Sequence, residues 1–161
     1  MITATSAPAS VIAYFGDRLR CHERLDRYTS ARLGGPADYL VVTRNREDLR
    51  AAARLAWEAS LPLLVLGAGS NVLIDDRGFR GLVVINRAQN VHFEVHERSA
   101  TVQAESGASL SALARQCIER GLSGLEWAVN VPGTVGGASG KCPSADHRHK
   151  AAVVRAATVL D

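Results

Sequence analysis

The sequence predicts an α/β (α+β) fold divided into two lobes, and three observations lead to that prediction. One apolar segment, one helical segment and two further apolar segments follow one another over residues 37–86. Two alternating segments, a helix and a last apolar segment then occupy residues 89–161. Each half also contains a glycine-rich stretch, "LGAGSN" in the first and "VPGTVGGA" in the second. We therefore expect an N-terminal lead-in over residues 1–36 and lobes at residues 37–88 and 89–161.

The lead-in and the first lobe follow a simple order of elements. A short helix starting at Ser10 and a polar stretch precede a strand at "DYLVV". The segment "NREDLRAAARLAWEAS" predicts a helix with Asn45 as its N-cap. Its apolar face is formed by Leu49, Ala52, Ala53 and Ala56. Two strands follow at "LPLLVLG" and "LVVIN", and the continuous apolar character of the former predicts burial on both of its faces.

The second lobe begins with a predicted hairpin. "VHFEVHE" and "SATVQAES" alternate between apolar and polar residues, with a turn near Arg98. Ser109 begins the helix "SLSALARQCIERG", which Gly121 ends. Its apolar face includes Cys117, which we expect to be a core residue. A final strand is predicted at "AAVVRAATVLD".

Composition limits the classes of partner. The 161 residues carry a formal net charge of +3, and the charges are scattered, so we expect a small anionic ligand rather than nucleic acid. The cysteines (Cys21, Cys117 and Cys142) are odd in number and widely spaced, which predicts no disulfide framework. No apolar run approaches the ~20 residues that span a bilayer, and no signal peptide is visible. We expect a cytoplasmic protein with no membrane partner.

The first glycine-rich stretch fits neither of the common phosphate-binding motifs. A dinucleotide-binding fingerprint needs a third glycine and a following helix, whereas position 72 is valine and "LIDDRGFRGLVVI" predicts loop and strand. A Walker A loop is also excluded, because no Gly-Lys-Ser/Thr sequence occurs. Backbone N–H groups of a tight glycine turn can still form an anion-binding nest, with Ser70 and Asn71 as further donors. "VPGTVGGA" offers the same device in the second lobe. Two tight turns between packed strands explain both stretches equally well on spacing alone.

Three segments together resemble a known enzyme family. "YTSARLGGPADYLVV", "LGAGSNVLIDDRGFRGLVV" and "GLSGLEWAVNVPGTVGGA" occur in the order found in the UDP-N-acetylenolpyruvoylglucosamine reductases (UDP-N-acetylmuramate dehydrogenases), from about Leu25 to Asp161. This family has an FAD-binding domain of the vanillyl-alcohol-oxidase type. The resemblance implies that both glycine-rich stretches bind FAD through Gly67, Ala68, Gly69, Ser70, Asn71, Val72, Val131, Pro132, Gly133, Val135, Gly136, Gly137 and Ala138.

The resemblance also implies a reaction. In the family, NADPH reduces FAD, and the reduced flavin reduces the enolpyruvyl group of a UDP-linked sugar for peptidoglycan synthesis. The arginine, serine and glutamate that act in the family, and its substrate domain, correspond to positions after Asp161, so no catalytic residue is assigned here. We therefore expect the FAD-binding part of such an enzyme, truncated, without activity on its own. The alternative is a non-catalytic or degenerate module that binds a flavin or a nucleotide.

One stretch departs from the family. After Ala138 the family continues with a small, glycine-rich loop, whereas this chain has "KCPSADHRHK", with Cys142, Pro143, Ser144 and His147 at altered positions. We expect this stretch to weaken FAD binding. Cys142, Asp146, His147 and His149 lack the paired spacing of structural zinc sites, so we predict a solvated loop and no metal. His22, His92 and His96 show no ligand pattern and are expected to be structural or exposed. Glu126 and Trp127 are expected to support the adjacent glycine-rich stretch.

Overall fold

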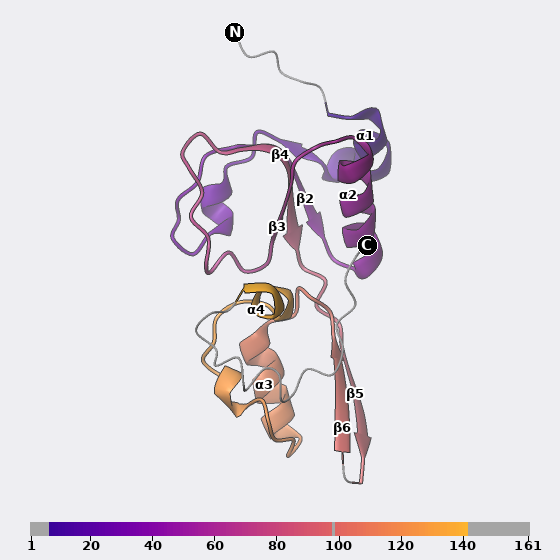
Figure 1. Cartoon of the computed structure of the whole chain (residues 1–161), viewed down its shortest axis with the longest axis vertical. Helices are drawn as coiled ribbons and strands as arrows, with labels where there is room; N and C mark the ends of the chain where they lie inside the picture. The colour runs from indigo at the N-terminus through magenta and orange to yellow at the C-terminus, as the bar shows by residue number, and fades with distance from the viewer. Residues whose placement is uncertain (1–6, 98, 142–161) are drawn as a thin grey trace. The chain divides into compact units, whose positions relative to one another are not determined.

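The computed structural model describes residues 7–97 and 99–141, which form parts of two compact units, residues 1–86 and 87–161 (Figure 1). The predicted strand at "AAVVRAATVLD", the turn at Arg98 and the "KCPSADHRHK" stretch from Cys142 onward lie outside the described residues.

The first unit is built on a four-stranded sheet. Its elements are helix α1 (Ala9–Phe15), strands β1 (Arg20–Cys21) and β2 (Ala37–Thr43), helix α2 (Arg46–Glu58), and strands β3 (Leu63–Leu66) and β4 (Phe79–Asn86). The strand order is β1-β2-β4-β3. Strand β4 runs parallel to both β2 and β3, while β1 is antiparallel to β2. The predicted strand, helix and two strands over residues 37–86 are thus confirmed.

The two faces of this sheet are covered differently. Helices α1 and α2 lie on one face, and the segments 25–36 and 67–78 lie on the other (Figure 1). Val41 and Val84 belong to the core beneath the helices, whereas Leu40 and Val83 belong to the core beneath the loops. This alternation follows from the period of two in a strand, which sends successive side chains to opposite faces. The connection between the parallel strands β3 and β4, residues 67–78, is an irregular loop without a helix.

Helix α2 begins as predicted. The Asn45 side chain accepts a hydrogen bond from the backbone N–H of Asp48 at 2.7 Å. Asp48 is buried and also accepts from the Arg18 guanidinium at 2.7 Å, which ties the segment after α1 to this helix. Ala52 and Ala56 are buried, as the predicted apolar face requires.

Strand β3 differs from its prediction. It was expected to be buried on both faces, but it is the edge strand of the sheet, and Leu63 and Val65 are 37% and 45% exposed. The run of apolar residues predicted the strand correctly. The position of the strand depends on the strand order, in which β3 pairs with β4 alone among the strands of this sheet, and the apolar run carries no information about that order.

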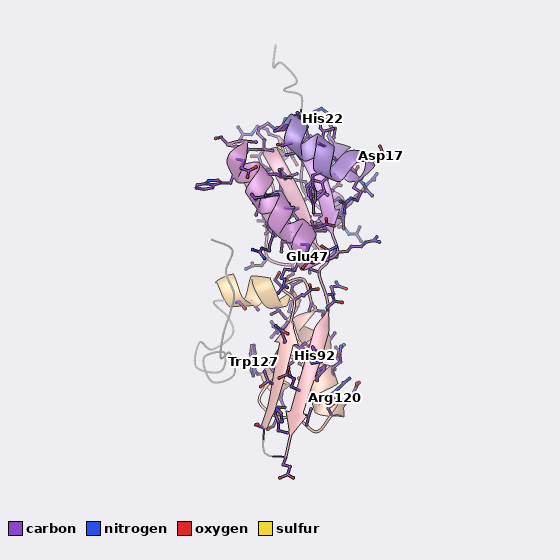
Figure 2. The ribbon with its side chains drawn as sticks, turned by 90° about the vertical axis from the view of Figure 1, so that its right-hand side faces the viewer. Asp17, His22, Glu47, His92, Arg120 and Trp127 are labelled. Carbon is purple, nitrogen blue, oxygen red and sulfur yellow. The ribbon has the colours of Figure 1, made fainter. Side chains whose placement is uncertain are left out.

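The second unit contains a hairpin and helices. Strands β5 (Val91–His96) and β6 (Ser99–Ala104) pair antiparallel, as predicted. Helix α3 (Leu110–Glu119) is capped by the Ser109 hydroxyl, and Cys117 is buried on its inner face. The Arg120 guanidinium lies 4.2 Å from the centre of the Phe93 ring and so links the end of α3 to β5. Figure 2 labels Arg120 and also His92, which is exposed on the hairpin.

Candidate functional site: two glycine-rich stretches

The first stretch, Gly67–Val72, is a loop that leaves the carboxyl end of β3. Gly69 is buried and has a φ of +66°, the left-handed region that glycine adopts without steric cost. A Cβ atom at this position would overlap the carbonyl oxygen of Tyr28. The Gly69 carbonyl oxygen accepts a hydrogen bond from the N–H of Ser30 at 2.9 Å. The loop is therefore fixed against Tyr28 and Ser30, at the end of the short 3-10 helix Leu25–Tyr28 and just after it.

The next residues of this loop line an open surface depression of about 430 Å³. Its lining is formed by residues from both segments: Ala31, Ser70, Asn71, Val72 and Leu73. Ser70 and Asn71 are exposed and provide a hydroxyl and an amide group. These neutral hydrogen-bonding groups suit the oxygen atoms of a phosphate, so the donor set fits the diphosphate part of a cofactor such as FAD.

Sequence reasoning missed the turn that forms the other side of this depression. Thr29 is buried, and its hydroxyl donates to the Leu33 carbonyl at 2.8 Å and accepts from the Leu33 N–H at 3.2 Å. The Arg32 N–H donates to the Thr29 carbonyl at 3.2 Å. Arg32 has a φ of +55°, which is uncommon for a residue with a side chain. No local pattern in "TSARL" predicts these bonds.

Tyr28 supports the same region through its ring and its backbone. Its hydroxyl donates to a Glu23 carboxylate oxygen at 3.2 Å and accepts from Arg20 at 3.1 Å. Burial, and then the nearby Glu23 carboxylate, raise the pKa of Tyr28, so its hydroxyl stays protonated at neutral pH. The residue acts as a neutral link that holds the backbone against Gly69.

The second stretch, Val131–Ala138, does not have the predicted open turn along its whole length. Helix α4 (Val135–Lys141) begins within it. The N–H of Val135 donates to the Ala108 carbonyl at 2.9 Å, and that of Gly136 donates to the Ser106 carbonyl at 2.8 Å. The N–H of Gly137 donates to the Thr134 hydroxyl at 3.4 Å. These amides therefore have protein acceptors in the structure, and the binding of FAD by Val131–Ala138 stays a prediction.

Trp127 belongs to the same apolar cluster as this stretch, whereas the Glu126 side chain bonds to Gly124 before it. Trp127, Val131, Val135 and Ala138 pack against one buried cluster of Leu110, Ala114 and Ala128. The indole N–H of Trp127 donates to the Gly124 carbonyl at 3.1 Å. A carboxylate oxygen of Glu126 accepts from the Gly124 N–H at 2.7 Å. Both side chains thus act in packing and turn formation.

The remaining predicted sites have separate outcomes. Within residues 7–97 and 99–141, no three metal-ligating side chains gather. Cys142, Asp146, His147 and His149, which were predicted to form a solvated loop without a metal, lie outside these residues. Among the described helices, none has the length and apolar character needed to cross a bilayer. The two glycine-rich stretches belong to different units, so their joint use of one ligand stays a prediction.

The sequence of this chain is similar to that of a known FAD-binding family. Residues 37–161 match a family model described as an FAD binding domain. UDP-N-acetylenolpyruvoylglucosamine reductase 2 of Symbiobacterium thermophilum is 44% identical over 143 residues, which is 89% of this chain and 46% of the relative. The chain belongs to the UDP-N-acetylenolpyruvoylglucosamine reductase family. It spans about half the length of the curated relatives it matches.

Solved structures of a member of this family and of another enzyme are similar to this chain. The UDP-N-acetylenolpyruvylglucosamine reductase of Thermus caldophilus has 32% identity and a TM-score of 0.55, covering 74% of this chain and 41% of that one. An alkyldihydroxyacetonephosphate synthase has 20% identity and a TM-score of 0.52, covering 80% of this chain and 27% of that one, and shows the fold alone. The predicted two-lobed FAD-binding fold of the vanillyl-alcohol-oxidase type is confirmed for this reductase family member.

Proposed function

We propose that this chain binds FAD through Gly67–Val72 and Val131–Ala138 as the cofactor-binding part of a UDP-N-acetylmuramate dehydrogenase. The observation that carries the proposal is the fixed Gly67–Val72 loop, whose Ser70 and Asn71 line an open depression. The family match over residues 37–161 supports FAD as the ligand. When bound, FAD supplies the redox chemistry, while the protein supplies binding and orientation.

The residues of the first stretch have distinct tasks in this proposal. Gly69 fixes the course of the loop, because only glycine fits between its neighbours and the Tyr28 carbonyl. Ser70 and Asn71 then donate to diphosphate oxygens, and Val72 packs toward the core beneath the loop. In the second stretch, Val131–Gly133 precede α4 and present backbone to the cofactor, whereas Val135–Ala138 hold that segment through the helix and its bonds to Ser106 and Ala108.

The relatives support a proposal for the wider reaction. They are reductases of UDP-N-acetylenolpyruvoylglucosamine, so we propose a UDP-linked sugar as substrate of the reaction that this chain serves, with NADPH as the reductant and peptidoglycan synthesis as the process. No residue of this chain is assigned to proton transfer. The cytoplasmic location expected from the sequence stays a prediction.

Titration of the purified chain with FAD, followed by flavin fluorescence, tests the proposal. We expect saturable binding that weakens at least about tenfold in the double variant Ser70→Ala and Asn71→Ala, because lost hydrogen bonds to a charged group each cost ~1.5–3 kcal/mol. The matched control is Thr101→Ala with Gln103→Ala, two exposed polar residues on β6. FAD affinity that is equal in both double variants would refute the assignment of the loop. Absence of FAD binding by the unmodified chain would favour a degenerate module.

A further inference from the structure

Arg32 stands out in the turn beside the depression because its backbone is strained. A φ of +55° in a residue with a side chain is strained and persists only where the surroundings hold it. Here the buried Thr29 holds it, through its hydroxyl bonds to Leu33 and its carbonyl bond to the Arg32 N–H. Glycine would adopt the same backbone conformation without strain. The arginine at this position therefore places a guanidinium group in the turn although its backbone is strained.

The charge of Arg32 is also unmatched within the described protein. Most arginines of the first unit pair with a carboxylate, among them Arg18 with Asp48, Arg77 with Asp75 and Arg80 with Asp38. Arg32 is exposed, and no carboxylate among the described residues lies within ion-pair distance of it. Its guanidinium is therefore available to an anion.

The backbone of Arg32 lies next to the depression. It directly follows Ala31, which lines the depression together with Ser70 and Asn71. The bond from the Ser30 N–H to the Gly69 carbonyl, at 2.9 Å, fixes the turn against the loop. Ser70 and Asn71 are neutral and offer hydrogen bonds alone, and a positive charge beside them would strengthen the binding of an anionic diphosphate. Guanidinium groups bind phosphate oxygens in pairs of parallel hydrogen bonds.

We propose that Arg32 binds the diphosphate of the cofactor at this depression and supplies its positive charge. This inference rests on the proposed function, since it names a further binding residue for the same ligand. Thr29 acts as a positioning residue, because it fixes the left-handed backbone from which Arg32 extends.

The test is FAD affinity of the full chain, measured by flavin fluorescence at low and at high salt. Arg32→Gln is expected to weaken binding about tenfold to a hundredfold at low salt and to reduce the salt dependence, because a charged contact is lost. Arg32→Lys should retain part of the affinity. Arg50→Gln is the matched control, since Arg50 is exposed on α2, and no carboxylate among the described residues lies within ion-pair distance of it.

Arg32→Gly separates binding from folding. It relieves the positive-φ strain, so its melting temperature should equal or exceed that of the unmodified chain, while its FAD affinity falls as in Arg32→Gln. FAD affinity and salt dependence that are unchanged in both variants would overturn the proposal for Arg32 and leave the proposed function standing. Failure of the unmodified chain to bind FAD would overturn both.

Discussion

The two glycine-rich stretches look alike in sequence but are built in different ways. Gly67–Val72 stays a loop because Gly69 is pressed against the Tyr28 backbone in a left-handed conformation. In Val131–Ala138, by contrast, Gly136 and Gly137 lie inside helix α4, and their N–H groups have acceptors at Ser106 and Thr134. In the first stretch, Gly69 allows a left-handed turn and close approach to the Tyr28 backbone. In the second, Gly136 allows helix α4 to pack closely against Ser106.

The largest change in the free energy of unfolding is expected from a substitution in the Gly67–Val72 loop. Gly69→Ala combines a left-handed backbone with overlap of the new Cβ and the Tyr28 carbonyl oxygen, so the loop must shift. We expect a loss of about 3 kcal/mol or more in the free energy of unfolding, measured by urea denaturation.

Gly121→Ala is the control for Gly69→Ala. Gly121 has a similar φ of +69°, but a Cβ atom there meets nothing within 4 Å. The backbone cost alone should therefore appear, at about 1–2 kcal/mol. Equal losses in the two variants would mean that the contact with Tyr28 does not restrain the loop.

Smaller losses of stability are expected when the N-cap residues of helices α2 and α3 are replaced. Asn45 accepts from the Asp48 N–H at 2.7 Å, whereas Ser109 accepts from the Ala112 N–H at 3.3 Å. Replacement of a capping residue by alanine costs ~0.5–2 kcal/mol. We expect Asn45→Ala near the upper end of that range and Ser109→Ala near the lower end. Asn45→Ser should restore most of the stability, and a larger loss at Ser109 than at Asn45 would contradict the order.

The helical conformation of the second stretch can be tested by replacing its glycines with alanine. A Cβ atom at Gly137 has the Thr134 hydroxyl oxygen as its nearest neighbour, at an ordinary contact distance of 3.5 Å. Gly137→Ala should therefore stabilise the chain by about 0.5–1 kcal/mol, because alanine favours a helix. Gly136→Ala should destabilise it, since the added Cβ would lie 2.8 Å from the Ser106 Cβ. Destabilisation by Gly137→Ala in the absence of ligand would argue against the helix.

The contrast between the stretches also shows which features a sequence can reveal. The caps at Asn45 and Ser109 and the faces of their helices depend on residues a few positions apart, so local patterns predicted them. Helix α4 was missed because two adjacent glycines disfavour a helix, and distant carbonyls of Ser106 and Ala108 override that preference. The edge position of β3 depends on strand order, which is equally non-local.

The candidate site was predicted in the same partial way. The loop residues Ser70 and Asn71 followed from the motif, and the structure places both beside one depression. The turn at Thr29–Leu33 was not predicted, because its hydroxyl bonds and the left-handed Arg32 have no sequence signature of their own. Contacts between this turn and the Gly67–Val72 loop join residues far apart in the sequence, so a local sequence pattern does not predict them.

The smallest expected effect concerns the buried thiol of the second unit. Burial is the main cause that raises the pKa of Cys117 above its ordinary value of 9.0. The folded chain therefore holds the thiol proton more tightly than the unfolded chain does. Its contribution to stability is complete below pH 9 and is lost as the pH rises through the folded pKa, since the unfolded thiol ionises first.

Urea denaturation between pH 8 and 10.5 measures this contribution. The free energy of unfolding should fall more steeply with pH in the unmodified chain than in Cys117→Ala, because the variant lacks the ionisable group. Cys21→Ala is the control in the first unit, where the exposed Cys21 contacts water before and after unfolding. It should keep the steeper slope of the unmodified chain. Parallel slopes for the unmodified chain and Cys117→Ala would show that the thiol ionises as readily in the folded protein as in the unfolded one, contrary to its buried position on α3.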